Sequence, residues 1–198
     1  MIIGWDVDGV LANTVDKILA YRNRIYGTSY RREQVISHDM HKLWGGTVNE
    51  AIEFFHRYYD SPEYRTTQPV EGSVEAVREL TSRGHEHKAV SARPLVIAQS
   101  TEDFIREHYG EKTFEKIVLT NQWSTGNSGA RMTKADVCRA EGVDVLVEDF
   151  VGYAEECAQA GVQTFLLDCP WNQSERLHSG VQRVKHLREV VEALSRKL

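Results

Sequence analysis

The stretch IIGWDVDGVL at residues 2–11 combines a short apolar run with two aspartates two positions apart. The run at residues 2–5 is typical of a buried strand, and Asp6, Asp8 and Gly9 lie where that strand would end. Two carboxylates at one strand end repel each other unless a cation or a shared proton relieves the repulsion. Gly9 would let the backbone approach a ligand or adopt a turn closed to other residues. The alternative is a polar strand end with an ordinary turn.

Short apolar runs alternate with helical patterns along the rest of the chain. Further strands are predicted at residues 88–90, 116–119, 143–147, 164–167 and 181–184. Helices are predicted at residues 73–83, 95–108, 134–141, 153–160 and 186–198. Strands that alternate with helices form a mainly parallel sheet covered on both faces. The predicted fold class is therefore α/β, with a three-layer, Rossmann-like parallel sheet.

Residues 14–68 interrupt this alternation with helical patterns and no convincing strand. Helices are predicted over residues 15–26 and 48–59. An insertion of about 55 residues is too long for a loop. We expect a small helical cap, residues 14–68, inserted after the first strand of a core made of residues 1–13 and 69–198. The cap would cover the carboxyl edge of the sheet, where open α/β sheets bind ligands.

Composition excludes several classes of protein. The 198 residues carry 24 Lys+Arg against 29 Asp+Glu, a net charge of −5, which excludes a generic electrostatic grip on nucleic acid or an anionic membrane. The first apolar run is too short for a signal peptide or a membrane span. Cys138, Cys157 and Cys169 form no C-x-x-C pair and are expected to be buried free thiols. We therefore expect a cytoplasmic protein with no membrane partner.

Three further sets of polar residues follow predicted strands or open predicted helices. Ser91-Ala92-Arg93 offers a hydroxyl and free backbone N–H groups, which suit either an anion or an ordinary helix cap. Lys134 opens a helix after a long polar loop and, taken alone, would be a solvated surface lysine. Glu148-Asp149 ends a buried strand. These sets, with the two aspartates of the first strand, are predicted to share one edge of one sheet.

The order of these residues resembles the four motifs of the haloacid dehalogenase superfamily of phosphohydrolases. The resemblance lies in DVDGVLA at residues 6–12, VSARP at 90–94, TKAD at 133–136 and VEDF at 147–150. The helical insertion, with SARP and the later segment CPWN at residues 169–172, resembles the 5′(3′)-deoxyribonucleotidase-like branch. That branch often has paired aspartates at the fourth motif, where this chain has Glu148 and Asp149, so the role of Glu148 is left open.

The resemblance implies a reaction and a metal. Asp6 would be the nucleophile that forms an aspartyl-phosphate, and Asp8 would protonate the leaving oxygen and then activate water. A Mg²⁺ ion would be held by Asp6, by the backbone carbonyl of Asp8 and by Asp149. Dehalogenase relatives lack the second aspartate because a halide leaves without an acid. The presence of Asp8 therefore favours a phosphatase.

The same resemblance implies how the phosphate is bound. Ser91 and the N–H of Ala92 would hold a phosphoryl oxygen. Lys134 would neutralise charge on the phosphate and on the nucleophile. Arg93 would support the phosphate or the substrate, or else form a salt bridge.

The substrate is expected to be decided by the cap, whose aromatic residues either stack on a base or form the core of the cap. Trp44, followed by two glycines, is the predicted substrate wall. The preferred substrates are small phosphate esters, namely nucleoside or deoxynucleoside monophosphates, with no nucleic-acid polymer as a partner. Residues 121–131 would either close over the site or form a surface loop.

Two other functions stay open. One is a phosphatase for another small metabolite or a nucleic-acid end, and the other is a non-catalytic phosphoryl-binding protein. The oligomeric state is also left open by the sequence.

Overall fold

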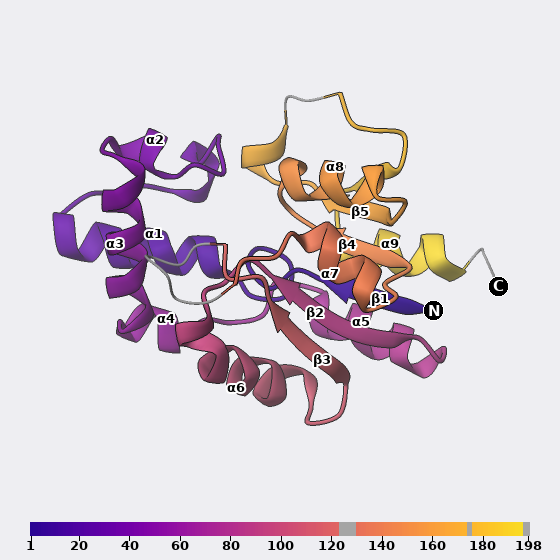
Figure 1. The fold of residues 1–198 in the computed structure, drawn as a ribbon. Coiled ribbons are helices and arrows are strands. Elements are labelled where there is room, and N and C mark those ends of the chain that lie inside the picture. The colour runs from indigo at the N-terminus through magenta and orange to yellow at the C-terminus, as the bar shows by residue number, and fades with distance from the viewer. Residues whose placement is uncertain (123–129, 174–175, 196–198) are drawn as a thin grey trace.

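One parallel sheet organises the molecule, which is described by a computed structural model at residues 1–122, 130–173 and 176–195. The strand order is β3-β2-β1-β4-β5-β6, and every neighbouring pair is parallel (Figure 1). The strands are β1 (Ile2–Trp5), β2 (Glu86–Ser91), β3 (Phe114–Leu119), β4 (Val145–Glu148), β5 (Gln163–Leu167) and β6 (Val181–Val184). The predicted α/β class with a Rossmann-like sheet is confirmed.

Helices cover both faces of the sheet and make three layers. Helices α5 (Ser73–Ser82), α6 (Ala98–Tyr109) and α9 (Leu187–Ser195) pack on one face. Helices α7 (Lys134–Ala140) and α8 (Val151–Gln159) pack on the other. The central strands are apolar along their whole length because both of their faces are buried.

Side-chain alternation in the strands supplies both cores. In β4, Val145 and Val147 pack in the cluster under α5 and α9, whereas Leu146 between them packs in the cluster under α7. In β1, Trp5 packs with the first of these clusters and is fully buried. Because successive side chains point to opposite faces, the residues within each strand fill the two cores. The polar groups lie where the strands end.

The cap contains more helices than the sequence predicted. Its elements are α1 (Thr14–Tyr26), a 3₁₀ turn η1 (Arg32–Gln34), α2 (His41–Trp44), α3 (Val48–Tyr59) and α4 (Pro62–Arg65). The predicted helices correspond to α1 and α3. Helices α2 and α4 have four residues each, which is too short to show a helical period.

The two ends of the insertion lie side by side. The Asn13 N–H donates to the Gln68 carbonyl at 2.8 Å, and the Val70 N–H donates to the Leu11 carbonyl at 3.0 Å. The chain thus leaves and re-enters the core at one place, and the helices between form a separate lobe at the left of Figure 1. We keep residues 14–68 as the proposed bounds of the cap.

Some element bounds differ from the predicted ones. The helix predicted from residue 95 starts as a 3₁₀ turn, η2 (Leu95–Ile97), and becomes α-helical only at Ala98. Helix α8 starts at Val151, two residues before its predicted start. A third 3₁₀ turn, η3 (Pro170–Asn172), follows β5 and was not predicted.

The strand order reverses direction between β1 and β4, since the chain builds outward to β3 on one side and to β6 on the other. Such a switch point opens a crevice at the carboxyl ends of the two strands.

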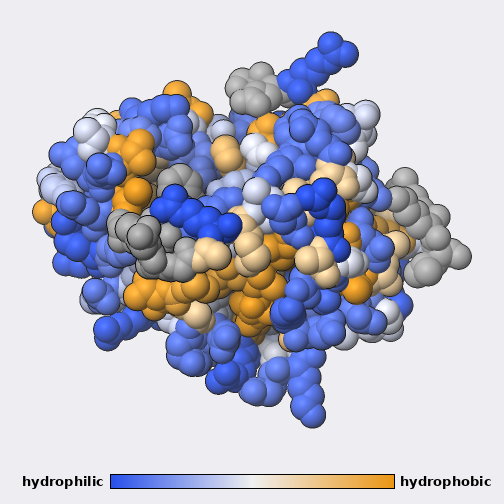
Figure 2. Space-filling view, in the orientation of Figure 1, coloured by the Kyte–Doolittle hydropathy of each residue, from blue (hydrophilic) through white to orange (hydrophobic). Residues whose placement is uncertain are grey.

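The face in Figure 2 is largely hydrophilic, with an apolar band across its middle. Among the described residues, no helix is long and apolar enough to cross a membrane.

Candidate active site

The turn after β1 sets the position of both first-motif aspartates. The Asp6 N–H donates to the Val147 carbonyl at 2.9 Å, which continues the pairing of β1 with β4. Gly9 has φ +82°, and a Cβ built on it would lie 2.0 Å from Asp149 Oδ2. A side chain at residue 9 would therefore both strain the backbone and collide with the fourth motif.

Lys134 lies between two carboxylates in the interior. Its Nζ donates to Asp6 Oδ1 at 2.6 Å and to Glu148 Oε2 at 2.7 Å, and its side chain is 1% exposed. It is the first residue of α7, and the Thr133 side chain caps that helix by accepting from the Asp136 N–H at 3.0 Å. Lys134 is therefore a buried, ion-paired lysine and not the solvated surface lysine that its position alone would suggest.

Glu148 is held by donors on both of its oxygens. Besides Lys134 on Oε2, its Oε1 accepts from the Asp149 N–H at 3.0 Å and from the Phe150 N–H at 3.1 Å. Glu148 is fully buried. This geometry gives Glu148 a clear contact role, the anchoring of Lys134, which the sequence left open.

Asp149 is oriented by two residues that the sequence analysis did not select. Trp171 Nε1 donates to Asp149 Oδ2 at 3.1 Å. Asn172 Nδ2 donates to the carbonyl of Asp149 at 2.8 Å and to that of Leu167 at 2.8 Å. Both residues belong to the CPWN segment after β5, and their place at a strand end on the same edge was the signal that could have found them.

Asp8 forms a two-pronged ion pair with Arg93. Arg93 Nε and Nη2 donate to the two oxygens of Asp8 at 2.9 and 2.8 Å, and Nη1 donates to Thr101 Oγ1 at 3.0 Å. Thr14, the first residue of α1, also donates to Asp8 Oδ1 at 2.5 Å. Of the two readings of Arg93 that the sequence left open, the salt bridge is the contact observed.

Ser91 and Ala92 lie at the end of β2, but only part of this motif faces the cavity. Ser91 is fully buried and its Oγ accepts from the Arg93 N–H at 3.3 Å. Ala92 and Arg93 line the cavity over the first motif, and Ser91 is not among its lining residues. The phosphate-binding role of Ser91 stays a prediction.

The buried charges at this edge do not balance. Oxygens of Asp6, Glu148 and Asp149 lie within 4.8 Å of one another, with Lys134 as the cation among them. Burial, followed by the charge of Glu148, raises the pKa of Asp6 to about 8. Burial, with the charges of Glu148 and Asp6, likewise raises the pKa of Asp149 well above its usual value.

The two remaining site groups are held in their charged forms. Burial opposes the charge of Lys134, but Asp6 and Glu148 raise its pKa well above the usual value. Burial also opposes the charge of Asp8, but the charge and hydrogen bonds of Arg93 hold the pKa of that carboxyl below its usual value. The site thus combines the ion pair of Asp8 and Arg93 with a carboxylate cluster in which burial and mutual repulsion disfavour the charged forms of Asp6 and Asp149.

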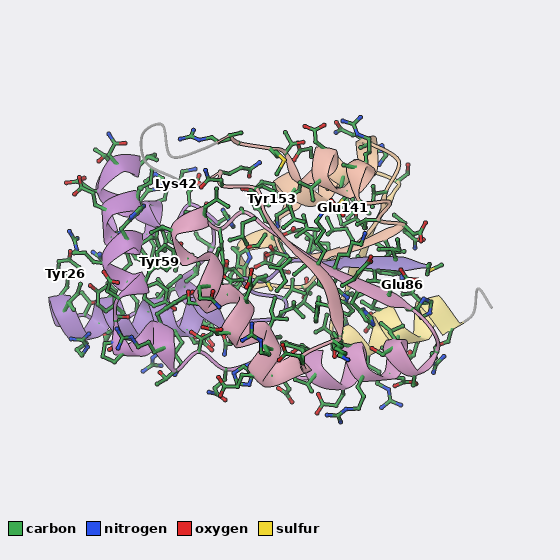
Figure 3. The ribbon with its side chains drawn as sticks, turned by 60° about the horizontal axis from the view of Figure 1, so that its bottom comes forward. Tyr26, Lys42, Tyr59, Glu86, Glu141 and Tyr153 are labelled. Carbon is green, nitrogen blue, oxygen red and sulfur yellow. The ribbon has the colours of Figure 1, made fainter. Side chains whose placement is uncertain are left out.

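A cavity of about 240 Å³ lies over these groups, between core and cap. Figure 3 shows Tyr59 on the cap and Tyr153 on the core, with Glu86 toward the opposite end of the sheet. The core side of the lining contains Asp6, Asp8, Ala92, Arg93, Lys134, Glu148, Asp149, Tyr153 and Trp171. Most of the cap side is apolar or aromatic, with Ile18, Val35, Met40, Ile52, Phe55, Tyr58 and Tyr59 among it.

Trp44 is not among the residues that line this cavity. The Arg22 guanidinium stacks 4.3 Å from the centre of its ring, and the ring packs 5.4 Å from that of Phe54. The structure therefore places Trp44 in the packing of the cap, whereas Phe55 and Tyr59 are the aromatic cap residues that line the cavity with Tyr58. The role of Trp44 as a substrate wall stays a prediction. Whether residues 121–131 close over the site or form a surface loop was left open by the sequence, and residues 123–129 of this segment lie outside the described residues.

Comparisons with solved structures agree with the fold. Protein Tyrosine Kinase A from Mycobacterium tuberculosis is 18% identical with a TM-score of 0.72, covering 98% of this chain and 97% of that chain. A predicted phosphatase from Clostridium acetobutylicum is 11% identical with a TM-score of 0.71, covering 98% of both chains. A haloacid dehalogenase-like family hydrolase from Streptococcus pneumoniae is 13% identical with a TM-score of 0.68, covering 98% of this chain and 97% of that chain.

At the level of sequence, no curated protein matches the chain. Residues 1–194 match the family described as "5' nucleotidase, deoxy (Pyrimidine), cytosolic type C protein". That match spans the core, the cap and all four motifs, and it confirms the resemblance drawn from the motifs. The chain therefore belongs to this nucleotidase family within the haloacid dehalogenase superfamily, and it is a phosphoric monoester hydrolase.

Proposed function

We propose that the chain is a Mg²⁺-dependent 5′-nucleotidase that hydrolyses nucleoside and deoxynucleoside monophosphates through phosphorylated Asp6. The observation that carries the proposal is the position of Asp6, which lies at the base of a cap-covered cavity and accepts a 2.6 Å hydrogen bond from Lys134. The aromatic cap residues in the lining, Phe55 and Tyr59 among them, support a planar base as part of the leaving group.

The donor set fits Mg²⁺. Asp6 and Asp149 supply hard oxygen ligands close together. The pKa of each is raised by burial and then by repulsion from neighbouring carboxylates, and a divalent cation would offset both effects. Asp6, the Asp8 carbonyl and Asp149 would hold the ion. Glu148 already accepts three hydrogen bonds, so we assign it to Lys134 and not to the metal. When bound, the ion would supply charge neutralisation for the incoming phosphate.

The chain's own residues provide the rest of the reaction. An oxygen of Asp6 attacks phosphorus as the bond to the ester oxygen breaks, and the leaving oxygen takes a proton from Asp8. Asp8 then takes a proton from the water that hydrolyses the phosphorylated carboxylate and frees inorganic phosphate. Lys134 fixes the attacking carboxylate and offsets charge on the phosphoryl oxygens.

The Arg93 pair affects how Asp8 works. Because Arg93 holds the pKa of Asp8 down, the carboxyl is an anion in this arrangement and suits the water-activating step. Protonating the leaving oxygen requires Asp8 to carry a proton, so that step needs a weaker hold by Arg93 than the 2.8 and 2.9 Å contacts give. A substrate phosphate that draws Arg93 toward itself would provide this change.

The place of action is also proposed. Cys138, Cys157 and Cys169 are buried free thiols, which supports a reducing compartment such as the cytoplasm.

The test is a phosphatase assay on the wild type with dUMP, UMP and glucose 6-phosphate, each with Mg²⁺ and with a chelator. We expect hydrolysis that requires Mg²⁺, is inhibited by Ca²⁺ and is faster for the nucleotides. Asp6→Asn should abolish turnover and the phosphoenzyme, whereas Asp103→Asn, an exposed aspartate on α6, should leave both unchanged.

A different result would contradict each part of the proposal. Full turnover in the metal-free enzyme would reject the Mg²⁺ assignment. Equal kcat/KM values for all three esters would reject the nucleotidase and leave the phosphatase. A phosphoenzyme formed by Asp6→Asn would reject the nucleophile.

A further inference from the structure

A tryptophan lies directly against the proposed metal ligand Asp149. Trp171, in η3, is buried and lines the cavity. Its indole Nε1 donates to Asp149 Oδ2 at 3.1 Å and lies 3.2 Å from the carbonyl oxygen of the same residue. A donor on one carboxylate oxygen limits the rotation of that carboxylate. Trp171 therefore helps to set the direction in which Asp149 presents its oxygens.

A cap residue packs on the ring of this tryptophan. The guanidinium carbon of Arg32, in η1, lies 4.8 Å from the centre of the Trp171 ring. Arg32 also interacts with the side chain of Cys169, two residues before Trp171. The same guanidinium is fastened to the start of α1, since its Nη1 donates to Asn13 Oδ1 at 3.2 Å and lies 3.5 Å from Asp16 Oδ1. Arg32 thus connects the cap to the segment that carries Trp171.

The core holds η3 at its last residue, Asn172. Arg183, on β6, donates to Asn172 Oδ1 and to the Asn172 carbonyl, each at 2.6 Å. Asn172 Nδ2 in turn donates to the Asp149 carbonyl at 2.8 Å. These bonds fix the backbone of η3 from the core, whereas Arg32 stacks on the Trp171 ring from the cap.

Arg32 lies outside the cavity. It is not among the cavity-lining residues, and it lines a separate groove together with Asp168 and Cys169. Trp171 lines the cavity and Arg32 stacks on its ring. The contacts of Arg32 therefore lead to the active site through Trp171.

We propose that Arg32 is a positioning residue that seats the Trp171 indole against Asp149, so that the affinity of the proposed metal site depends on a contact from the cap. This inference rests on the proposed function, because it requires Asp149 to hold a divalent cation. Removing a neighbour that orients a metal ligand typically lowers metal affinity by about 10–100-fold. An arginine stacked on tryptophan is a favourable pair, because its planar cation lies on the ring face.

The test measures Mn²⁺ binding to the full chain by electron paramagnetic resonance of the free ion. Asp149→Asn removes a proposed ligand and so identifies the binding that belongs to this site. Trp171→Phe keeps a ring and loses the N–H, so its Kd for Mn²⁺ should rise by about tenfold. Arg32→Lys keeps the positive charge and loses the planar guanidinium, so its Kd should rise by about threefold.

A double variant shows whether Arg32 acts through Trp171. Once the indole N–H is gone there is no donor left to seat, so Arg32→Lys should change the Kd for Mn²⁺ by less than about twofold in the Trp171→Phe background. At saturating Mg²⁺, Arg32→Lys should also keep the KM for dUMP within about twofold, because Arg32 does not line the cavity. A raised KM with unchanged Mn²⁺ binding would assign Arg32 to the substrate and overturn this inference.

A matched control is available on the cap. Arg24 also has its guanidinium over a ring, 5.5 Å from the centre of Tyr21, and it pairs with Glu63. It is not among the cavity-lining residues. Arg24→Lys should leave both the Kd for Mn²⁺ and the KM for dUMP unchanged.

The outcomes separate this inference from the proposed function. If the wild type binds Mn²⁺ no more tightly than Asp149→Asn does, the proposed metal site fails. If the wild type binds Mn²⁺ at this site and Arg32→Lys changes the Kd by less than about twofold, or changes it equally in both backgrounds, Arg32 does not act through Trp171 and only this inference is overturned. Should Trp171→Phe fail to fold, Arg32→Lys and Arg24→Lys decide, since a loss of affinity confined to Arg32→Lys supports the inference and equal values contradict it.

Discussion

At the scale of single residues, the geometry of the site depends on Gly9, which has no side chain. Gly9 lets the first-motif turn come so close to Asp149 that a Cβ would lie 2.0 Å from its Oδ2. The sequence predicted a turn or a close approach at Gly9. It did not identify the neighbour, because Asp149 lies 140 positions along the chain and reaches Gly9 only when β1 pairs with β4.

We expect Gly9→Ala to lose turnover by at least about a hundredfold, since Asp149 must move away from the proposed metal position. Gly27→Ala is the matched control. Gly27 also has a positive φ, of +63°, but nothing lies within 4 Å of the Cβ position. That variant should lose about 1–2 kcal/mol of stability from backbone strain while keeping its kcat. Assays of kcat with thermal unfolding check both variants, and an active Gly9→Ala would contradict the close approach.

The second prediction at this scale concerns Asp8 and Arg93. Asp8→Asn should lower kcat by more than about a thousandfold, because it removes the proposed acid and base. It should also lower the free energy of unfolding by roughly 3 kcal/mol, because the Arg93 side chain is 3% exposed and loses its anionic partner. Asp103→Asn, whose partner Arg106 is exposed, should change stability by less than about 1 kcal/mol. Urea unfolding at neutral pH measures both, and an unchanged stability of Asp8→Asn would show that the pair is weak.

At the scale of elements, long periodic segments were predictable and short ones were not. Helices α1 and α3 show an apolar period over 13 and 12 residues, so the sequence placed both. Helix α2 has four residues, and a four-residue segment does not reveal which side of it faces a ligand. That is why Trp44, its last residue, was predicted to form a substrate wall, although its ring packs on Arg22 and Phe54.

This placement changes what substitution of the cap aromatic residues should do. Trp44→Ala should lower the free energy of unfolding by roughly 2–3 kcal/mol through lost packing, with the KM for dUMP nearly unchanged. Phe55→Ala, in the cavity lining, should raise the KM for dUMP by about tenfold, the equivalent of a lost stacking contact of 1–3 kcal/mol. Steady-state kinetics with thermal unfolding separates the two. A selective rise in KM for Trp44→Ala would restore the predicted substrate wall.

At the scale of the whole molecule, the motif order predicted which residues would meet, but it did not predict their contacts. Asp6, Lys134 and Asp149 were expected at one edge because parallel strands end together. The bonds from Trp171 to Asp149 and from Arg93 to Asp8 depend on how η3 and the turn after β2 fold over that edge. Neither arrangement has a sequence period, so tertiary structure alone reveals it.

The fold also contains a buried histidine, His87, whose protonation in acid should destabilise the folded protein. Trp5 Nε1 donates to His87 Nδ1 at 3.0 Å, and His87 Nε2 lies 3.0 Å from Thr81 Oγ1. An accepting Nδ1 requires the neutral ring. Burial, followed by the charge of His85, accordingly lowers the pKa of His87 to about 4.

Because the pKa of His87 is lower in the folded protein than in the unfolded chain, the free energy of unfolding should decrease as the pH is lowered. Above about pH 6.5 the ring is neutral in both states and has no effect. Between about pH 6.5 and 4 the unfolded chain gains the proton first, so the free energy of unfolding should fall by up to roughly 3 kcal/mol, and below that range the loss levels off. Urea unfolding from pH 7.5 to 4 measures this. His87→Gln, which cannot gain the proton, should have a shallower slope than the wild type, and His186→Gln, at an exposed position, should keep the wild-type slope. If wild type and His87→Gln lost stability in parallel, the acid sensitivity would have to come instead from carboxylates whose pKa is lowered by folding, such as Asp8 and Glu63.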